Sequence, residues 1–228
     1  MSERHEIAAP APTRHETTVL VQPPVDGCRT LSRALRYRLS MLFYVHAQDK
    51  PGVADQLLEF AEAHWSYMDR FDGRLILRGP TLSDDGEEHT GSVHIVDLAD
   101  RPAAERFATE EPYWRAGLYG EFTAAPAVVL LHRELAADAP YTLVTAQWPP
   151  HARTPGDAGQ RLLGAEPDGR LSFVAVLVDD DQDSTTGVVA AVRALPDEAR
   201  SLVQAWADQL AGGPVPLKAQ RWQRGGRN

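Results

Sequence analysis

An internal repeat constrains the fold of this chain more than any other sequence feature. The tetrapeptide DGRL occupies residues 72–75 and again residues 168–171. Further along, Thr90-Gly91 and Val93 return as Thr186-Gly187 and Val189. All these pairs have the same offset, so no gap separates them. Ala47-Gln48 pairs with Ala146-Gln147 after a small length adjustment. Several matches in one register indicate an internal duplication.

Both halves of the repeat predict the same order of secondary structure. In the first half, alternating or continuously apolar segments predict strands at 41–48, 75–80, 91–98 and 118–131, and helices at 53–71 and 102–109. In the second half, strands are predicted at 141–148, 171–180, 186–195 and 215–224, with helices at 154–164 and 197–210. The order β-α-β-β-α-β is that of the ferredoxin-like split βαβ arrangement. We therefore predict an α+β chain with two tandem ferredoxin-like domains.

A single unit of this kind carries helices on one face of its sheet and leaves the other face bare. Two units packed sheet to sheet cover both bare faces, and we expect them to enclose a cavity lined by both sheets. The predicted domains are residues 41–131 and 140–224. Residues 1–40 form a predicted mobile extension, rich in proline up to residue 27, with a possible short helix at 30–40.

Composition excludes several classes of function. The net charge of −9 argues against a nucleic-acid partner, because phosphate binding needs a basic face, although a small anionic ligand is compatible with it. Cys28 is the single cysteine, so no internal disulfide forms. No run of 18 apolar residues predicts a membrane span, and the polar N-terminus is unlike a secretory signal. These features favour a cytoplasmic protein.

Residues 41–126 resemble the YciI family of the dimeric α/β barrel superfamily. The resemblance rests on MLFYVHAQDKPG at 41–52, His64 late in the first helix, GRLILRGP at 73–80, GSVHIVDL at 91–98, EPYWRAGLYGEF at 111–122 and Pro126. It implies an intramolecular version of the dimeric barrel, as a monomer or homodimer. It also implies a small-molecule site, because this fold serves cofactor-free isomerases, a dehydrochlorinase, cofactor-free monooxygenases and heme-binding proteins.

The resemblance implies a catalytic set of His64, Glu111 and Asp49. The family pairs its helix histidine with the aspartate of a DPY segment, which Glu111-Pro112-Tyr113 matches here with a longer carboxylate. Asp49 matches a second family acid after the first strand. From the residues alone, His64 shares an apolar helix stripe and could be a core histidine; a functional imidazole there would exchange protons near neutral pH. The repeat places Gln160 at the equivalent position, so the second copy is expected to be degenerate.

Other side chains are candidates for lining the site. His46 and His94 lie on predicted strands that could be adjacent, and Tyr113, Trp114 and Tyr119 could stack on an aromatic ligand or serve as core. Together with His89, the strand histidines invite a metal interpretation, but their spacing is not that of a zinc site, and no metal is predicted. The acidic loops at 84–88 and 179–183 lack the calcium-loop pattern.

The leading hypothesis is an enzyme without a bound cofactor. It would act on a small cyclic or polyketide-like molecule, as in secondary metabolism, by isomerisation, elimination or cyclisation. His64 would be the acid/base, Glu111 its positioning residue and Asp49 a secondary polar group. The alternative is a non-catalytic ligand-binding or accessory protein, and a third interpretation is cofactor-free oxygenation or heme binding. The sequence does not specify the substrate or the reaction type.

Overall fold

The computed structural model describes residues 41–136, 139–151 and 169–226. The predictions for residues 1–40 and for a helix at 154–164, which includes Gln160, lie outside the described residues. The first half contains, in order, β1 (Met41–Asp49), α1 (Ala54–Asp69), a 3-10 turn η2 (Asp72–Arg74), β2 (Leu75–Leu82), β3 (His89–Leu98), α2 (Arg101–Thr109), α3 (Pro112–Arg115) and β4 (Tyr119–His132). The second half contains β5 (Tyr141–His151), β6 (Leu171–Val178), β7 (Thr185–Val192), α5 (Pro196–Ala211) and β8 (Lys218–Trp222).

The eight strands form one closed antiparallel barrel in the order β1-β3-β2-β8-β5-β7-β6-β4. Within it, β4-β1-β3-β2 and β8-β5-β7-β6 are two ferredoxin-like sheets with the same internal order. Two edge-to-edge pairings join them, β4 with β6 and β2 with β8. The predicted fold class is confirmed, and a single chain closes the barrel.

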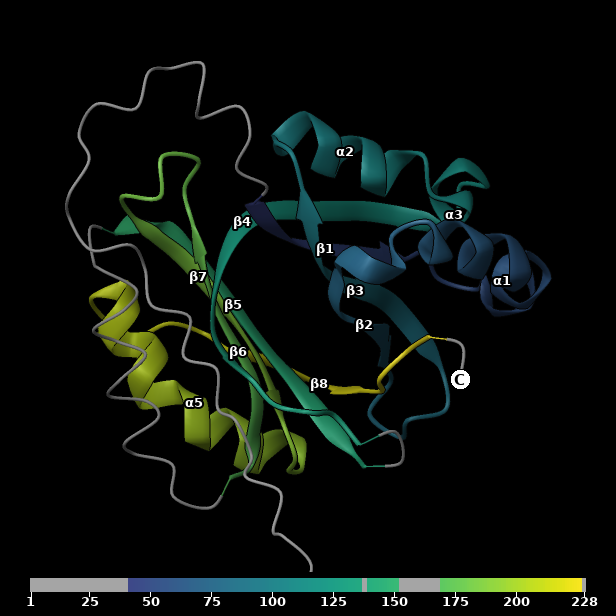
Figure 1. Cartoon of the computed structure of the whole chain (residues 1–228). Helices are drawn as coiled ribbons and strands as arrows, with labels where there is room; N and C mark the ends of the chain where they lie inside the picture. The colour runs from purple at the N-terminus through teal and green to yellow at the C-terminus, as the bar shows by residue number, and fades with distance from the viewer. Residues whose placement is uncertain (1–40, 137–138, 152–168, 227–228) are drawn as a thin grey trace, which may run out of the picture.

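The helices cover the outside of the barrel (Figure 1). Helices α1, α2 and α3 lie over the first sheet, and α5 lies over the second. The barrel interior is largely filled by apolar side chains from both sheets, among them Tyr44, Ile95, Phe173 and Trp222. A space of about 230 Å³ lined by both sheets, as we expected, remains among these side chains, whereas the site described below lies outside the barrel.

Two glycines of the repeat are retained for the same structural reason. A Cβ on Gly91 would lie 2.4 Å from the carbonyl oxygen of Ala47, and a Cβ on Gly187 would lie 2.4 Å from that of Ala146. Each glycine lies on the third strand of its unit, opposite the end of the first. The close approach of the two backbones excludes any side chain.

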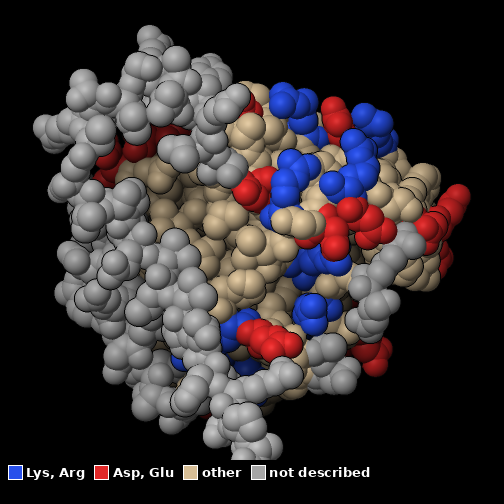
Figure 2. All heavy atoms as spheres, viewed as in Figure 1, with Lys and Arg blue, Asp and Glu red and all other residues tan. Residues whose placement is uncertain are grey.

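On the face shown in Figure 2, basic and acidic side chains are interspersed, and no broad basic patch is visible. In the described part of the chain, no helix has the length and apolar character needed to cross a membrane.

Candidate active site between helix α1 and the first sheet

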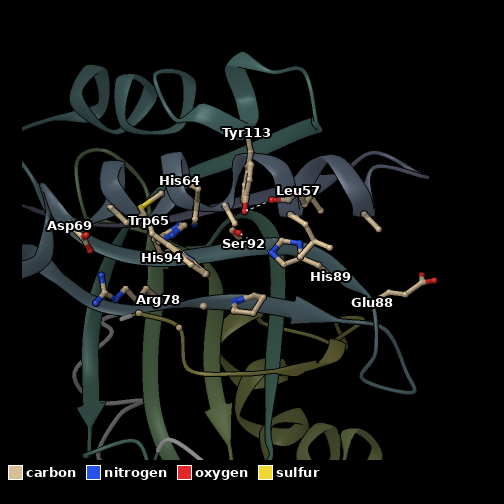
Figure 3. Close-up of a pocket in the computed structure, with 18 of the residues that line it drawn as sticks. Leu57, His64, Trp65, Asp69, Arg78, Glu88, His89, Ser92, His94 and Tyr113 are labelled. Carbon is tan, nitrogen blue, oxygen red and sulfur yellow. Dashed lines mark hydrogen bonds between the residues drawn. The ribbon is translucent and has the colours of Figure 1, made fainter. Parts of the chain in front are cut away.

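A cavity of about 370 Å³ lies between α1 and the outer face of β2 and β3. Helix α1 contributes an apolar wall of Leu57, Ala61, Trp65 and Met68. The strands contribute polar side chains that face this wall (Figure 3), namely Arg78, His89, Ser92 and His94. Gly225 and Gly226, which follow β8, complete the lining, so the second half of the chain contributes to the site.

His64 and Glu111 form a buried pair in this cavity. Nδ1 of His64 lies 2.5 Å from Oε1 of Glu111, and the two side chains are 11% and 4% exposed. Glu111 is the N-cap residue of α3, and its Oε2 accepts a hydrogen bond of 2.9 Å from the backbone N–H of Trp114. Capping therefore fixes the carboxylate. Because Nδ1 donates to it, Nε2 is the nitrogen of His64 that is left for a ligand.

Tyr113 packs against the face of the His64 ring. The two rings stack with centroids 4.4 Å apart and planes inclined by 6°. The Tyr113 hydroxyl donates to the carbonyl of Leu57, and burial, followed by the charges of Glu111 and Asp49, raises the pKa of Tyr113 to about 12. Tyr113 is therefore neutral at physiological pH and serves as a stacking surface.

A second histidine–carboxylate pair borders the same cavity. Nδ1 of His89 lies 2.6 Å from Oδ2 of Asp49, whose side chain is 6% exposed. Oδ1 of Asp49 is buried and has no hydrogen-bond partner among the described residues. On its other side, Nε2 of His89 lies 3.4 Å from Oγ of Ser92, which in turn accepts a hydrogen bond of 2.8 Å from the Tyr119 hydroxyl.

The remaining cavity histidine, His94, is a neutral polar group. Burial, and then the positive charges of His64, Arg78 and His46, hold the pKa of His94 well below its ordinary value. The guanidinium of Arg78 lies 3.1 Å from Asp72 and is 20% exposed. Among the described residues, the cavity therefore offers imidazole nitrogens, the Arg78 guanidinium and an apolar wall, a combination that suits a small molecule with oxygen substituents, and Asp69, Glu87 and Glu88 add carboxylates to the lining.

Residues 41–126 match the model of the YCII-related domain. The same region is 30% identical over 93 residues to protein YciI of Escherichia coli O6:H1, an alignment that takes in 38% of this chain and 95% of that protein. The chain belongs to the YciI family. A Haemophilus influenzae protein is 29% identical over 93 residues, an alignment that takes in 38% of this chain and 95% of that protein.

Two solved structures illustrate what the YciI-type fold resembles. A variant chlorite dismutase of Candidatus Nitrospira defluvii is 8% identical, with a TM-score of 0.50 over 84% of this chain and 94% of that one. This likeness extends through both halves and concerns the fold. A 5-chloro-2-hydroxyhydroquinone dehydrochlorinase of Burkholderia phenoliruptrix AC1100, in complex with 2,5-dihydroxybenzoquinone, is 26% identical over 37% of this chain and 90% of that one, with a TM-score of 0.35.

The YciI-type site brings together some of the predicted residues and leaves others out. His64, His94 and Tyr113 line the cavity, Glu111 lies directly behind His64, and Asp49 lies behind His89. Tyr119 is one layer deeper, bonded to Ser92. Burial, and then the Glu111 charge, raises the pKa of Tyr119 well above its ordinary value, so its hydroxyl stays protonated.

His46 and Trp114 do not line this cavity. The β1–β3 register pairs Val45 with His94 and His46 with Val93, so the two histidines lie on adjacent strands but on opposite faces of the sheet. His46 faces a polar space of about 230 Å³ at the barrel mouth, shared with Gln147 and Lys218 of the second unit. Trp114 packs against Phe122, with ring centroids 5.1 Å apart.

The sequence prediction did not place His89, Ser92 and Arg78 at the site, although all three line the cavity. His89 was considered only as a metal ligand, yet no group of three His, Cys, Asp or Glu side chains suited to a metal occurs within the described ranges. One sequence signal could have indicated the contact between His89 and Asp49. His89 lies at the start of one strand, and Asp49 ends the strand beside it.

Proposed function

We propose that this protein is an enzyme that moves a proton on a small, cyclic, oxygen-substituted organic molecule, using His64 as acid/base and no bound cofactor. The observation that carries the proposal is the arrangement of His64 itself. Its Nδ1 is fixed on a buried, capped carboxylate, and the ring is held by Tyr113 at the edge of a cavity with an apolar wall. A carboxylate behind an imidazole sets its tautomer and stabilises the imidazolium that forms when Nε2 takes a proton.

The lining of the cavity supports the choice of ligand. Leu57, Ala61 and Met68 offer a surface for a ring, while Arg78 and His94 offer hydrogen-bond donors to its oxygen atoms. A cation and a neutral imidazole at the developing negative charge would stabilise an enolate or phenolate. Isomerisation, elimination and cyclisation each begin with such an intermediate.

The test is a screen for proton exchange. Cyclic enones, enol lactones and hydroxyquinones are incubated with the protein in D₂O, and deuterium incorporation is followed by mass spectrometry. For any compound that exchanges, His64→Gln should lower the rate by about 10²–10⁴-fold, the usual contribution of a general acid/base. Glu111→Gln should lower it less, because the imidazole remains in place.

Thermal melting separates this role from a packing role. His64→Gln should leave the melting temperature nearly unchanged while the exchange rate collapses. A His64→Gln protein that melts several degrees lower and exchanges at the wild-type rate would show that His64 is a core residue. Compounds that bind but never exchange in any variant would favour the non-catalytic alternative.

A further inference from the structure

A second imidazole in the same cavity repeats the arrangement of His64, and no function is assigned to it by the family resemblance. His89 contacts the buried carboxylate of Asp49 through Nδ1, at 2.6 Å, as His64 contacts Glu111 at 2.5 Å. Both imidazoles line the cavity (Figure 3). The two pairs come from different elements, since His64 is on α1 and His89 begins β3, and each carboxylate lies on the side of its imidazole away from the ligand space.

Tyr113 relates the two imidazoles in space. The Tyr113 ring stacks on His64 at 4.4 Å and meets His89 edge to face, with centroids 6.4 Å apart and planes at 76°. Both histidines therefore flank one aromatic ring at the edge of a cavity of about 370 Å³. Both imidazoles line this cavity, and its volume accommodates a ligand with a single ring.

The hydrogen bonds around His89 leave its Nε2 available. With Nδ1 donating to Asp49, a neutral His89 carries a lone pair on Nε2, and the hydrogen-bonding contact of Nε2 among the described residues is Oγ of Ser92 at a long 3.4 Å. Oδ1 of Asp49 is buried and has no hydrogen-bond partner among the described residues. This carboxylate therefore interacts mainly with His89, because a buried acceptor with few partners interacts strongly with the donor that contacts it.

We propose that His89, fixed by Asp49, is a second acid/base that works with His64 on one bound molecule, which makes the reaction a proton shift between two positions of that molecule. The inference rests on the proposed function and narrows it to an isomerisation. One histidine enters neutral and the other protonated. The neutral Nε2 removes a proton from a C–H next to a carbonyl, and the C–H electrons move to the carbonyl oxygen as an enolate.

The protonated Nε2 then delivers its proton to a second carbon, and the electrons return from oxygen to form the new C–H bond. The substrate leaves as an isomer with no change in oxidation state and with no co-reactant. The histidines have exchanged protonation states, which exchange with solvent resets. Asp49 and Glu111 are positioning residues in this scheme, because each acts only through its imidazole.

The test needs no substrate. ¹⁵N–¹H correlation spectra of the histidine side chains in the wild-type protein at neutral pH should show a proton on Nδ1 of both His64 and His89, with Nε2 bare on whichever of the two is neutral. Phenacyl bromide, a small aromatic alkylating agent, should then alkylate Nε2 of each residue with loss of bromide, and peptide mass spectrometry gives the rate at each site.

Matched variants separate the two pairs. Asp49→Asn should slow alkylation of His89 by at least about tenfold, because an amide partner favours the wrong tautomer, and should leave His64 unchanged. Glu111→Gln should slow alkylation of His64 and leave that of His89 unchanged. His94, which lines the same cavity with no carboxylate bonded to it among the described residues, is the internal reference and should react alike in all three proteins.

A neutral His89 that carries its proton on Nε2 and none on Nδ1 in the wild-type spectrum would overturn the inference, and this result does not depend on any variant folding. Alkylation of His89 that is indifferent to Asp49→Asn would overturn it too, as would an adduct on Ser92 in place of His89. If alkylation of His64 is unchanged in Glu111→Gln, that result counts against the proposed function instead. The two failures are therefore distinguishable.

Discussion

His46 should make the protein lose stability in mild acid. The ring is buried in the barrel wall, where its Nδ1 accepts a hydrogen bond of 3.0 Å from the Tyr44 hydroxyl. Burial, and then the charge of Lys218, lowers the pKa of His46 to about 4 from an ordinary 6.5. The unfolded chain therefore binds a proton between these values when the folded chain does not, so the stabilisation present above pH 6.5 is lost as the pH falls toward 4.

The size of the effect follows from the two pKa values. Between about pH 7.5 and about pH 5, the linkage relation gives a loss of roughly 2 kcal/mol in the free energy of unfolding for this one group. His94 contributes in the same direction, because burial lowers its pKa as well. A His46→Gln variant keeps His94, so comparison with the wild type isolates the contribution of His46.

Urea unfolding, monitored by tryptophan fluorescence, measures this contribution to the free energy of unfolding. The wild type should lose about 2 kcal/mol more than His46→Gln between the two pH values. His132→Gln is the matched control: partial burial lowers the pKa of His132 too, but its side chain is exposed at the end of β4, so the variant should change the pH dependence much less. If wild type and His46→Gln show the same pH dependence within about 0.5 kcal/mol, a typical limit of additivity, the argument from burial fails.

Two further predictions concern stability. Gly91→Ala and Gly187→Ala should each destabilise by roughly 1–3 kcal/mol, because the added methyl group meets a backbone carbonyl of the neighbouring strand; Gly73→Ala, where a Cβ meets nothing within 4 Å, is the control, and equal melting temperatures for all three would contradict this. Asp180→Ala removes an ion pair with Arg101 that bridges the two halves, yet both side chains are substantially exposed, so the loss should stay below about 1 kcal/mol in urea unfolding. A loss above about 2 kcal/mol would show that the bridge holds the halves together.

The repeat made the fold predictable from the sequence, for a reason that the structure explains. Strand periodicity located the eight strands, and the repeated Thr-Gly pair marked equivalent points in the two sheets. Gly91 and Gly187 resist change because the first strand of each unit passes too close for any side chain. Such a contact acts on both copies independently, so it keeps the repeat visible where the rest of the sequence has diverged.

The side of the sheet that carries the site was not predictable from the sequence. Alternation shows that His46 and His94 each lie on some face of a strand, but the shared face depends on the register between β1 and β3. Here Val45 pairs with His94, and one residue of difference sends His46 into the barrel. The His89–Asp49 pair depends on the same register, since Gln48 pairs with Gly91 and so brings the end of β1 to the start of β3. The pattern of a single sequence carries no information on this register, and so none on how close His89 lies to Asp49.

The two junctions of the barrel differ in length. The β4–β6 junction pairs residues from Ala127 to His132, whereas the β2–β8 junction pairs only Thr81 and Leu82, extended by backbone bonds from Gln223 and Gly225. Gly79 packs so closely on this tail that a Cβ there would lie 1.9 Å from the carbonyl oxygen of Gln223. Local unfolding begins where few hydrogen bonds must break, and amide hydrogen exchange reports it. We expect the amides of this shorter junction to exchange first, and because Gly225 and Gly226 also line the cavity, the fluctuation that opens the barrel also moves one wall of the cavity.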